Sequence, residues 1–436
     1  MKIAIVGTGI SGLVAAHRLH PHHEVMLFEA DSRIGGHANT VDVTLDGVTH
    51  AVDTGFIVYN ERNYPGFSAL LRELGVATQP TEMSFGVADA GSGLEYRGSN
   101  LNTLFAQRRN IYRPSFLRLL TEIARFNRAA RALVADEQPW RGADRLALPA
   151  SQIDVATEEE SLAQFVERGR YSRAFVSLFL IPFGASIWSA DPATFTRFPV
   201  RAYARFMHNH GLLGIGARPA WRTVTGGSRR YVEALTASFA DRIRLASPVH
   251  KILPRSTGAG ENIVELLTDR GPETFDRIVI ATHSDQALRM LADANAGERS
   301  ILGAIGYQRN TATLHSDERM LPANSRARAS WNYAIDATSR LATVTYWMNS
   351  LQSIDSTRPL LVTLNRSAAI DPRTVHAEFE YHHPVFDAAA IAAQRRRHEI
   401  QGRRGIYFAG AYWGYGFHED GVQSGIEVAD AIGQTS

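Results

Sequence analysis

The sequence predicts an α/β fold, in which a doubly wound parallel sheet carries an inserted α+β domain with helices and an antiparallel sheet. Three observations support this. The first 60 residues have the order strand, glycine turn, helix, strand. The same α/β pattern returns near residue 226 and again close to the C-terminus. Between these blocks the chain is first mostly helical and then consists of short β-like runs.

The doubly wound elements are expected in three blocks. Apolar runs bounded by turn residues predict strands at 2–6, 25–29, 244–251, 263–267, 277–281 and 405–410. Helical spacing of apolar residues predicts helices at 11–19, 231–239 and 421–432. We therefore assign residues 1–61, 222–285 and 400–436 to one discontinuous domain.

The intervening segments are assigned to a second domain, residues 62–221 and 286–399. Its first part is mostly helical, and the clearest helix is expected at 115–134. Its second part contains the β-like runs 328–335, 342–348, 360–364 and 375–381, which suit an antiparallel sheet.

Composition excludes several classes of protein. The chain has 436 residues and no cysteine, so disulfides, thiolate metal sites, iron-sulfur clusters and thioether-linked cofactors are excluded. The formal net charge of +2 gives no reason to expect nucleic acid as a partner. The most apolar stretch, 175–188, is interrupted by Pro182 and Gly184 and is too short to span a bilayer. With no signal peptide visible, we expect a cytoplasmic protein.

A G-x-G-x-x-G motif lies between the first strand and the first helix, with Gly7, Gly9 and Gly12 at its fixed positions. The first glycine permits a tight turn, the second lets a diphosphate approach the backbone, and the third lets helix and strand pack closely. Glu29 closes the second strand, where an acid accepts hydrogen bonds from ribose hydroxyls. The motif predicts a dinucleotide, and the acid disfavours NADP.

The segment from Glu29 to His37 resembles the E-x-x-x-R-x-G-G-R extension of the flavin-dependent amine oxidase and phytoene desaturase superfamily. Arg33 can neutralise the diphosphate, and Gly35 and Gly36 allow backbone amides to approach it. The sequence departs from the pattern at His37, where the superfamily commonly has a second arginine.

The resemblance continues at 52–56, 226–228, 247–249, 276–282, 407–410 and 419–425. It implies a glutathione-reductase-like FAD-binding domain, non-covalent FAD, and a substrate-binding domain with a helical cap. Beyond the motif residues above, it places the cofactor against Ile10, Ser11, Ala30, Thr54, Gly55, Phe56, Val249, Ala281, Gly410, Gly421 and Val422. In the family the last helix directs its N-terminus at the flavin, which favours the negative charge that develops there on reduction.

Four segments are similar to a bacterial branch labelled NAD/FAD-binding protein, which includes the furan fatty acid pathway desaturase. They are 54–60, 331–333, 382–386 and 416–421. This similarity implies a desaturase or dehydrogenase of an unsaturated, methylated fatty acyl or phospholipid chain, with hydride transfer to flavin N5. No second nucleotide motif is visible, so oxygen, a quinone or a carrier protein is expected to be the electron acceptor.

Three other functions remain open. A flavin amine oxidase is disfavoured because relatives that oxidise amines use a lysine near the flavin, whereas this chain has only Lys2 and Lys251. A carotenoid-type polyene desaturase or isomerase would use the same kind of apolar tunnel. A non-catalytic lipid-binding escort is disfavoured by the complete glycine motif.

His418 and Glu419 lie in the presumed flavin motif and are the leading candidates for proton transfer or flavin tuning. His382, with its neighbour His383, comes next. Aromatic residues are candidates for lining an apolar tunnel, and Tyr59 among them is also a catalytic candidate; the set is Tyr59, Trp188, Trp331, Tyr346, Trp347, Tyr412, Trp413, Tyr415 and Phe417. No metal site is expected, since His20, His22 and His23 read as a solvated turn.

The helix at 115–134 has an apolar stripe opposite arginines and follows Arg108, Arg109 and Arg113. A basic amphipathic helix can lie on an anionic bilayer, although such helices more often cover a core. With a lipidic substrate, we expect weak peripheral contact with the anionic cytoplasmic membrane face.

Overall fold

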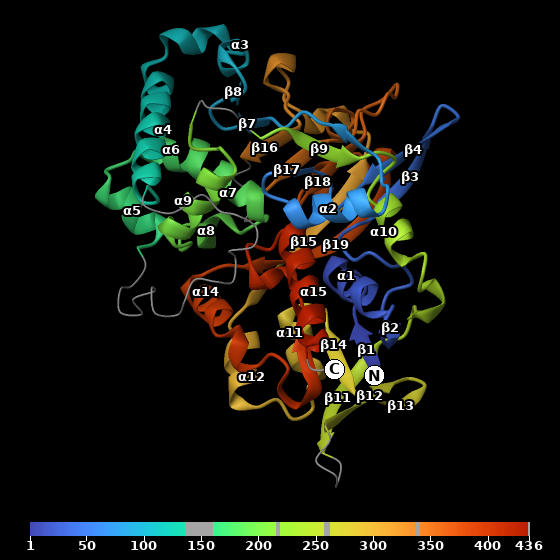
Figure 1. The fold of residues 1–436 in the computed structure, drawn as a ribbon. Coiled ribbons are helices and arrows are strands. Elements are labelled where there is room, and N and C mark those ends of the chain that lie inside the picture. The colour runs from blue at the N-terminus through green and yellow to red at the C-terminus, as the bar shows by residue number, and fades with distance from the viewer. Residues whose placement is uncertain (136–159, 215–218, 257–261, 336–340, 435–436) are drawn as a thin grey trace.

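The computed structural model describes residues 1–135, 160–214, 219–256, 262–335 and 341–434 (Figure 1). It has a parallel sheet with helices on both faces and a larger mixed sheet that is covered by a group of helices. The predicted fold class is therefore confirmed.

The parallel sheet has the strand order β10-β2-β1-β14-β20. Its strands are β1 (Lys2–Val6), β2 (Glu24–Phe28), β10 (Ile243–Arg244), β14 (Arg277–Ile280) and β20 (Ile406–Phe408). All four neighbouring pairs are parallel. Residues 3–6 of the central strand are all buried, because both faces of a parallel sheet are covered.

One face of this sheet packs against α1 (Ile10–Leu19), α10 (Arg229–Thr236) and α15 (His418–Gly433). The other face packs against α11 (Ser284–Met290), α12 (Ala296–Leu302) and α14 (Ala388–Arg395). Helix α15 begins three residues earlier than predicted, since the Asp420 carboxylate accepts a hydrogen bond from the Phe417 amide at 2.8 Å. This bond caps the helix at its start.

The strand predicted at 244–251 is two strands in two sheets. After β10 the chain turns at Ala246, which has a φ of +45°, and continues as β11 (Val249–Ser256). This strand forms a separate antiparallel sheet with β12 (Asn262–Thr268) and β13 (Gly271–Phe275). The left-handed turn directs the chain out of the parallel sheet.

The larger sheet has seven strands in the order β19-β15-β18-β17-β16-β7-β8. They are β7 (Phe85–Asp89), β8 (Leu94–Arg97), β15 (Gly306–His315), β16 (Trp331–Ile335), β17 (Val344–Trp347), β18 (Leu361–Leu364) and β19 (Val375–Val385). The strands formed by the predicted β-like runs pair antiparallel with their neighbours β15 to β19. The sheet continues beyond them through β7, which pairs with β16 in parallel. The hairpin of β7 and β8 also interrupts the region predicted to be mostly helical, since Gly91 and Gly93 allow a tight turn there.

The helices beside this sheet form the helical layer on the left of Figure 1. They are α3 (Leu101–Leu104), α4 (Pro114–Ala132), α5 (Leu162–Arg168), α6 (Arg173–Phe175), α7 (Ile181–Trp188), α8 (Pro192–Phe195) and α9 (Val200–Asn209). The apolar stripe of α4, including Phe116, Leu119 and Phe126, is buried in the core of this domain. This part of the stripe covers the core, as amphipathic helices more often do, and membrane contact of the helix stays a prediction. No helix in the described parts of the chain is long and apolar enough to cross a membrane.

Short elements join the two large sheets. They are the hairpin of β3 (Thr40–Leu45) and β4 (Val48–Asp53), the small sheet of β5 (Tyr59–Asn60), β6 (Thr78–Pro80) and β9 (Trp221–Val224), and the helices α2 (Pro65–Glu73) and α13 (Met348–Leu351). Buried Asp53 ties these parts together, because it accepts hydrogen bonds from the Ser228 amide and from the Gln352 side chain.

Candidate functional site

In the glycine turn after β1, one of the three motif glycines has room for a side chain and the other two have none. A Cβ at Gly7 would lie 2.8 Å from the Ala281 carbonyl oxygen, and Gly7 has a φ of +102°. A Cβ at Gly12 would lie 2.1 Å from the Gly7 oxygen. At Gly9 a Cβ would meet nothing within 4 Å. Gly9 is thus the point at which a diphosphate can approach the backbone.

The second glycine segment lies directly against this turn. The Gly35 amide donates to the Thr8 carbonyl at 3.0 Å, and a Cβ at Gly36 would lie 3.0 Å from the Gly9 Cα. Within the described chain, the buried Arg33 Nη1 and His37 Nε2 have no hydrogen-bond partner. A diphosphate supplies oxygen acceptors for such donors, so these residues fit the predicted cofactor.

Glu29 joins the glycine turn to the segment predicted to hold adenosine. Its Oε2 accepts hydrogen bonds from the Thr8 amide at 2.9 Å and the Thr8 hydroxyl at 2.6 Å. The Ser247 amide donates to the Glu29 carbonyl at 2.8 Å, which brings the start of β11 at Val249 beside the end of β2. Ala30 follows Glu29 and is exposed.

The residues predicted to contact the flavin ring meet at the start of α15. The Phe56 amide donates to the His37 carbonyl at 2.8 Å, and a Cβ at Gly55 would lie 2.2 Å from the same oxygen. The Phe56 ring stacks on His418 with a centroid distance of 3.8 Å. Thr54 and Tyr381 share a hydroxyl–hydroxyl hydrogen bond of 2.9 Å, which connects this segment to β19.

The C-terminal glycine segment reaches the same region. The Gly410 amide donates to the Ser424 hydroxyl at 3.0 Å, so the end of β20 is held against α15. Gly421 faces α1, because a Cβ there would lie 2.6 Å from Ile10 Cγ2 and 3.0 Å from the Ser11 hydroxyl. Val422 is fully buried. The N-terminus of α15, with its positive helix dipole, therefore lies beside the glycine turn.

His418 is the first residue of α15 and forms a neutral pair with Tyr231. Its Nε2 lies 2.8 Å from the Tyr231 hydroxyl oxygen. Burial lowers the pKa of His418 to about 3 and raises the pKa of Tyr231 well above its usual value. Both groups are therefore uncharged at neutral pH.

Glu419 caps helix α2. Its two carboxylate oxygens accept hydrogen bonds from the Gly66 and Phe67 amides, each at 2.9 Å, and Gln423 donates to Oε1 at 2.7 Å. The carboxylate is 1% exposed. Its negative charge at a helix N-terminus is favourable, and this arrangement points to a structural rather than a proton-transfer role.

The two other catalytic candidates, Tyr59 and His382, differ in burial. Tyr59 lies on β5 and is buried. Its ring packs against Phe67 of α2, with the two ring centroids 5.3 Å apart. His382 is partly exposed, and its Nε2 lies within hydrogen-bond distance of Glu380 Oε1, 2.8 Å, on the same strand.

His383, the neighbour of His382 on β19, faces the candidate site instead. Its ring centroid lies 5.4 Å from that of His37, and Tyr381 lies 5.0 Å from His37. Alternation along a strand puts Tyr381 and His383 on one face and His382 on the other. That alternation is the signal in the sequence that distinguishes the two histidines.

His37, His283 and His383 form a histidine cluster from three separate segments. The ring centroids of His37 and His283 lie 6.1 Å apart. Burial lowers the pKa of His283 and of His383 to about 4, and it lowers the pKa of His37 well below the ordinary value. In the flavin-free protein the three rings are therefore neutral at pH 7.

We expect this histidine cluster to make the flavin-free protein less stable as pH falls. A histidine with a pKa near 4 in the folded protein and 6.5 in the unfolded chain does not change the free energy of unfolding above pH 6.5. Between pH 6.5 and 4 the unfolded chain binds the proton and the folded protein does not, so the folded protein becomes less stable as pH falls. Glutamine does not titrate, so the free energy of unfolding lost on replacing His383 with glutamine should be smaller at pH 5 than at pH 7. Urea unfolding of both proteins at the two pH values measures this, and an equal difference at both values would contradict it.

Close to Glu419 lies a small cavity of about 20 Å³, room for about one water molecule. It is lined by Asn63, Tyr64, Phe206, Asn209, His210, Tyr415, Phe417 and Glu419. Trp188 and Phe206 pack beside it, with ring centroids 4.7 Å apart. The nine aromatic residues considered for a tunnel do not all gather here, because they are divided among four core clusters.

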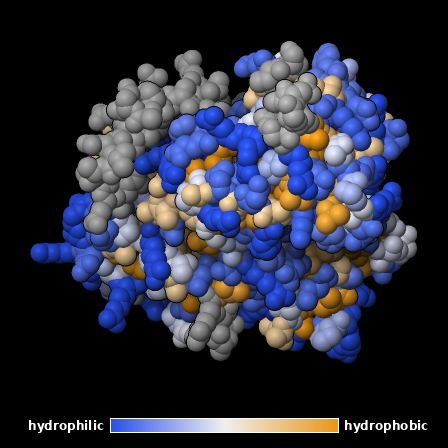
Figure 2. Space-filling model, turned by 90° about the horizontal axis from the view of Figure 1, so that it is seen from below, coloured by the Kyte–Doolittle hydropathy of each residue, from blue (hydrophilic) through white to orange (hydrophobic). Residues whose placement is uncertain are grey.

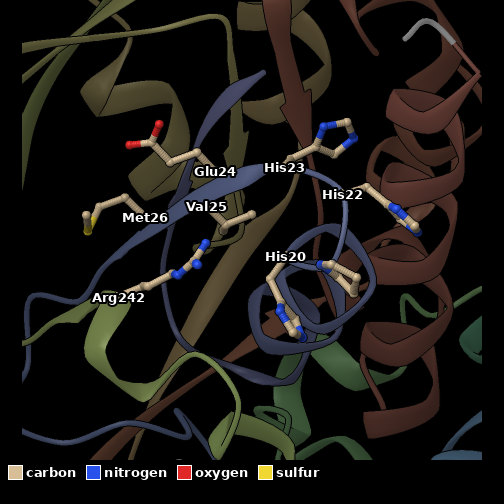
Figure 3. A pocket seen from close by; sticks show the side chains of 8 residues that line it. His20, His22, His23, Glu24, Val25, Met26 and Arg242 are labelled. Carbon is tan, nitrogen blue, oxygen red and sulfur yellow. The ribbon is translucent and has the colours of Figure 1, made fainter.

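His20, His22 and His23 line an open surface pocket of about 530 Å³ at the turn between α1 and β2. Figure 3 shows that their side chains point in different directions. In the described ranges no group of three or more His, Asp or Glu side chains is arranged so that it could hold a metal ion.

Both lysines lie away from the candidate site. Lys2 starts β1, at the end of the parallel sheet opposite the glycine turn, and its ammonium lies 4.6 Å from the centre of the Phe275 ring. Lys251 is exposed on β11. No lysine therefore reaches Phe56 and His418.

A family model described as flavin containing amine oxidoreductase matches residues 10–312. The chain belongs to this family. This member of the flavin amine oxidoreductases is accordingly a flavin oxidoreductase with FAD as its cofactor. No curated protein matches its sequence. The individual cofactor contacts described above stay predictions.

Solved structures share the fold of this family member at low sequence identity. Cyclohexylamine oxidase from Brevibacterium oxydans IH-35A has a TM-score of 0.70 at 17% identity, with 100% of this chain and 99% of that chain covered. Putrescine oxidase bound to putrescine has a TM-score of 0.69 at 16% identity, with the same coverage. A CLA-producing fatty acid isomerase from P. acnes has a TM-score of 0.65 at 15% identity, covering 99% of this chain and 98% of that chain.

Proposed function

We propose that the protein is an FAD-dependent desaturase or dehydrogenase that acts on an unsaturated fatty acyl or phospholipid chain. The observation that carries this proposal is the wall of the small cavity next to α15, in which four of the eight lining residues are phenylalanine or tyrosine. Phe206 and Phe417 stack there with a centroid distance of 5.0 Å. Such a wall suits an apolar chain.

The same wall offers no free negative charge to a cationic substrate. Among the residues that line the small cavity, Glu419 is the only carboxylate. Its oxygens already accept hydrogen bonds from Gly66, Phe67 and Gln423. An ammonium group would find no carboxylate here that is free of hydrogen bonds, so the burial of its charge would be only partly compensated. The position of both lysines away from His418 also disfavours amine oxidation.

Bound FAD would supply a two-electron acceptor for the conversion of a substrate CH–CH bond to C=C, in which one carbon loses a hydride and the other loses a proton to a base. Arg33, His37 and the Gly9 backbone would hold the diphosphate. Phe417 and Phe206 would exclude water from the reacting carbons. The His418 ring, oriented by the Tyr231 hydroxyl 2.8 Å from its Nε2, would receive the substrate proton.

Anaerobic reduction of the FAD-loaded protein tests the substrate class. We expect unsaturated and methyl-branched acyl lipids to bleach the flavin absorbance, and small primary amines and polyamines to leave it unchanged. Reduction by an amine and by no lipid would replace this proposal with a flavin amine oxidase, a function that the family itself includes.

The role of His418 is tested in the same assay. Replacing His418 with alanine should slow flavin reduction by roughly 10²-fold, the usual scale for losing a positioned proton-transfer group. Tyr231→Phe keeps the ring and removes the hydroxyl, and its effect should be smaller. FAD content, measured by absorbance, should not change in either variant. Wild-type reduction rates in both variants would remove this pair from catalysis.

A further inference from the structure

An exposed basic and apolar surface lies at the outer end of the helical layer, and we call residues 101–118 the arginine tip. It comprises α3, the short 3-10 helix Arg108–Tyr112 and the first turn of α4. In Figure 1 it lies at the top of the helical layer, away from both termini.

Large apolar side chains are exposed at the arginine tip. In the described chain eight large hydrophobic residues are exposed, and four of them lie here: Leu101, Ile111, Tyr112 and Leu117. Tyr112 is 86% exposed and Leu101 is 74% exposed. The face seen in Figure 2, from below, shows hydrophobic residues only in small groups between hydrophilic ones. Clustered exposed apolar residues mark an interaction surface.

The charged side chains of the arginine tip are all positive. Residues 98–121 contain Arg108, Arg109, Arg113 and Arg118 and no Asp or Glu. Among the described residues, the first three form no ion pair, and Arg118 pairs with the buried Glu122. A short turn packed against α3 adds the exposed Arg326. The nearest acid on β8, Glu95, accepts hydrogen bonds from the Ala323 and Asn324 amides.

We propose that the arginine tip binds the surface of an anionic lipid bilayer. Arginines flank these apolar side chains, so the guanidinium groups meet lipid phosphates while the apolar groups enter the interface. The surface is distinct from the apolar stripe of α4, which is buried in the core. The proposal is independent of the proposed reaction, because it concerns binding alone.

Vesicle sedimentation of the FAD-loaded protein tests this proposal. We expect binding to mixed phosphatidylcholine and phosphatidylglycerol vesicles, weaker binding at higher salt, and little binding to phosphatidylcholine alone. The combined substitutions Leu101→Ser, Arg109→Gln and Tyr112→Ser should lower the affinity roughly tenfold or more. Flavin absorbance and thermal unfolding should remain those of the wild type, since these side chains are exposed.

A control variant carries Leu245→Ser and Arg270→Gln, which alter an exposed leucine and arginine in the other domain. It should bind vesicles like the wild type. Absence of binding to anionic vesicles, or equal losses in the tip and control variants, would overturn the proposal. A wild-type dimer that is lost in the tip variant, without vesicle binding, would assign the surface to a second copy of the chain instead.

Discussion

Replacing Gly9 with valine should weaken FAD binding and leave the flavin-free fold intact. The fold tolerates a side chain here, because a Cβ at Gly9 meets no atom within 4 Å and the backbone is extended with a φ of −68°. The same open space is the approach for the diphosphate, so the added side chain should lower FAD affinity by roughly tenfold or more. Flavin fluorescence titration measures affinity, and urea unfolding of the flavin-free protein measures stability.

Gly306→Val is the matched control, since a Cβ at Gly306 also meets nothing within 4 Å and this glycine starts β15. Its FAD affinity should equal that of the wild type.

Acid precipitation of the wild-type protein should release FAD into the supernatant, because the contacts described are non-covalent and the chain has no cysteine. Full FAD occupancy in Gly9→Val would refute the assigned diphosphate site.

Replacing Glu419 with glutamine should destabilise the protein by about 2 kcal/mol, the scale for leaving a buried donor without its acceptor. The glutamine amide has one oxygen, so it cannot accept from both the Gly66 and Phe67 amides as the carboxylate does. It also removes a negative charge from the N-terminus of α2. Denaturant unfolding measures the change in the free energy of unfolding.

Glu73→Gln at the other end of α2 is the control, because Glu73 is exposed and its carboxylate lies 2.8 Å from His17 Nε2 at the surface. It should change stability little. The flavin reduction rate of Glu419→Gln distinguishes a helix-capping role of this residue from a proton-transfer role. A wild-type stability with a large loss of rate would overturn the capping role and restore Glu419 as a proton-transfer group.

Local patterns in the sequence predicted most of the parallel sheet. A buried strand, a glycine turn and an amphipathic helix each depend on neighbouring residues, so Lys2–Val6 and Ile10–Leu19 lie within one residue of their predicted bounds. The pairing of β7 with β16 was not predictable, because it joins segments about 245 residues apart in the chain. The split between β10 and β11 depended on one left-handed residue, Ala246.

By itself the sequence determined the glycine turn, the acid at Glu29 and the second glycine pair, since each is fixed by backbone conformation over a few residues. Only the tertiary structure decided what the polar side chains contact. It placed Glu419 on the amides of α2, more than 350 residues earlier in the chain, and His383 beside His37. Such contacts form when distant segments pack together, and no local spacing encodes them.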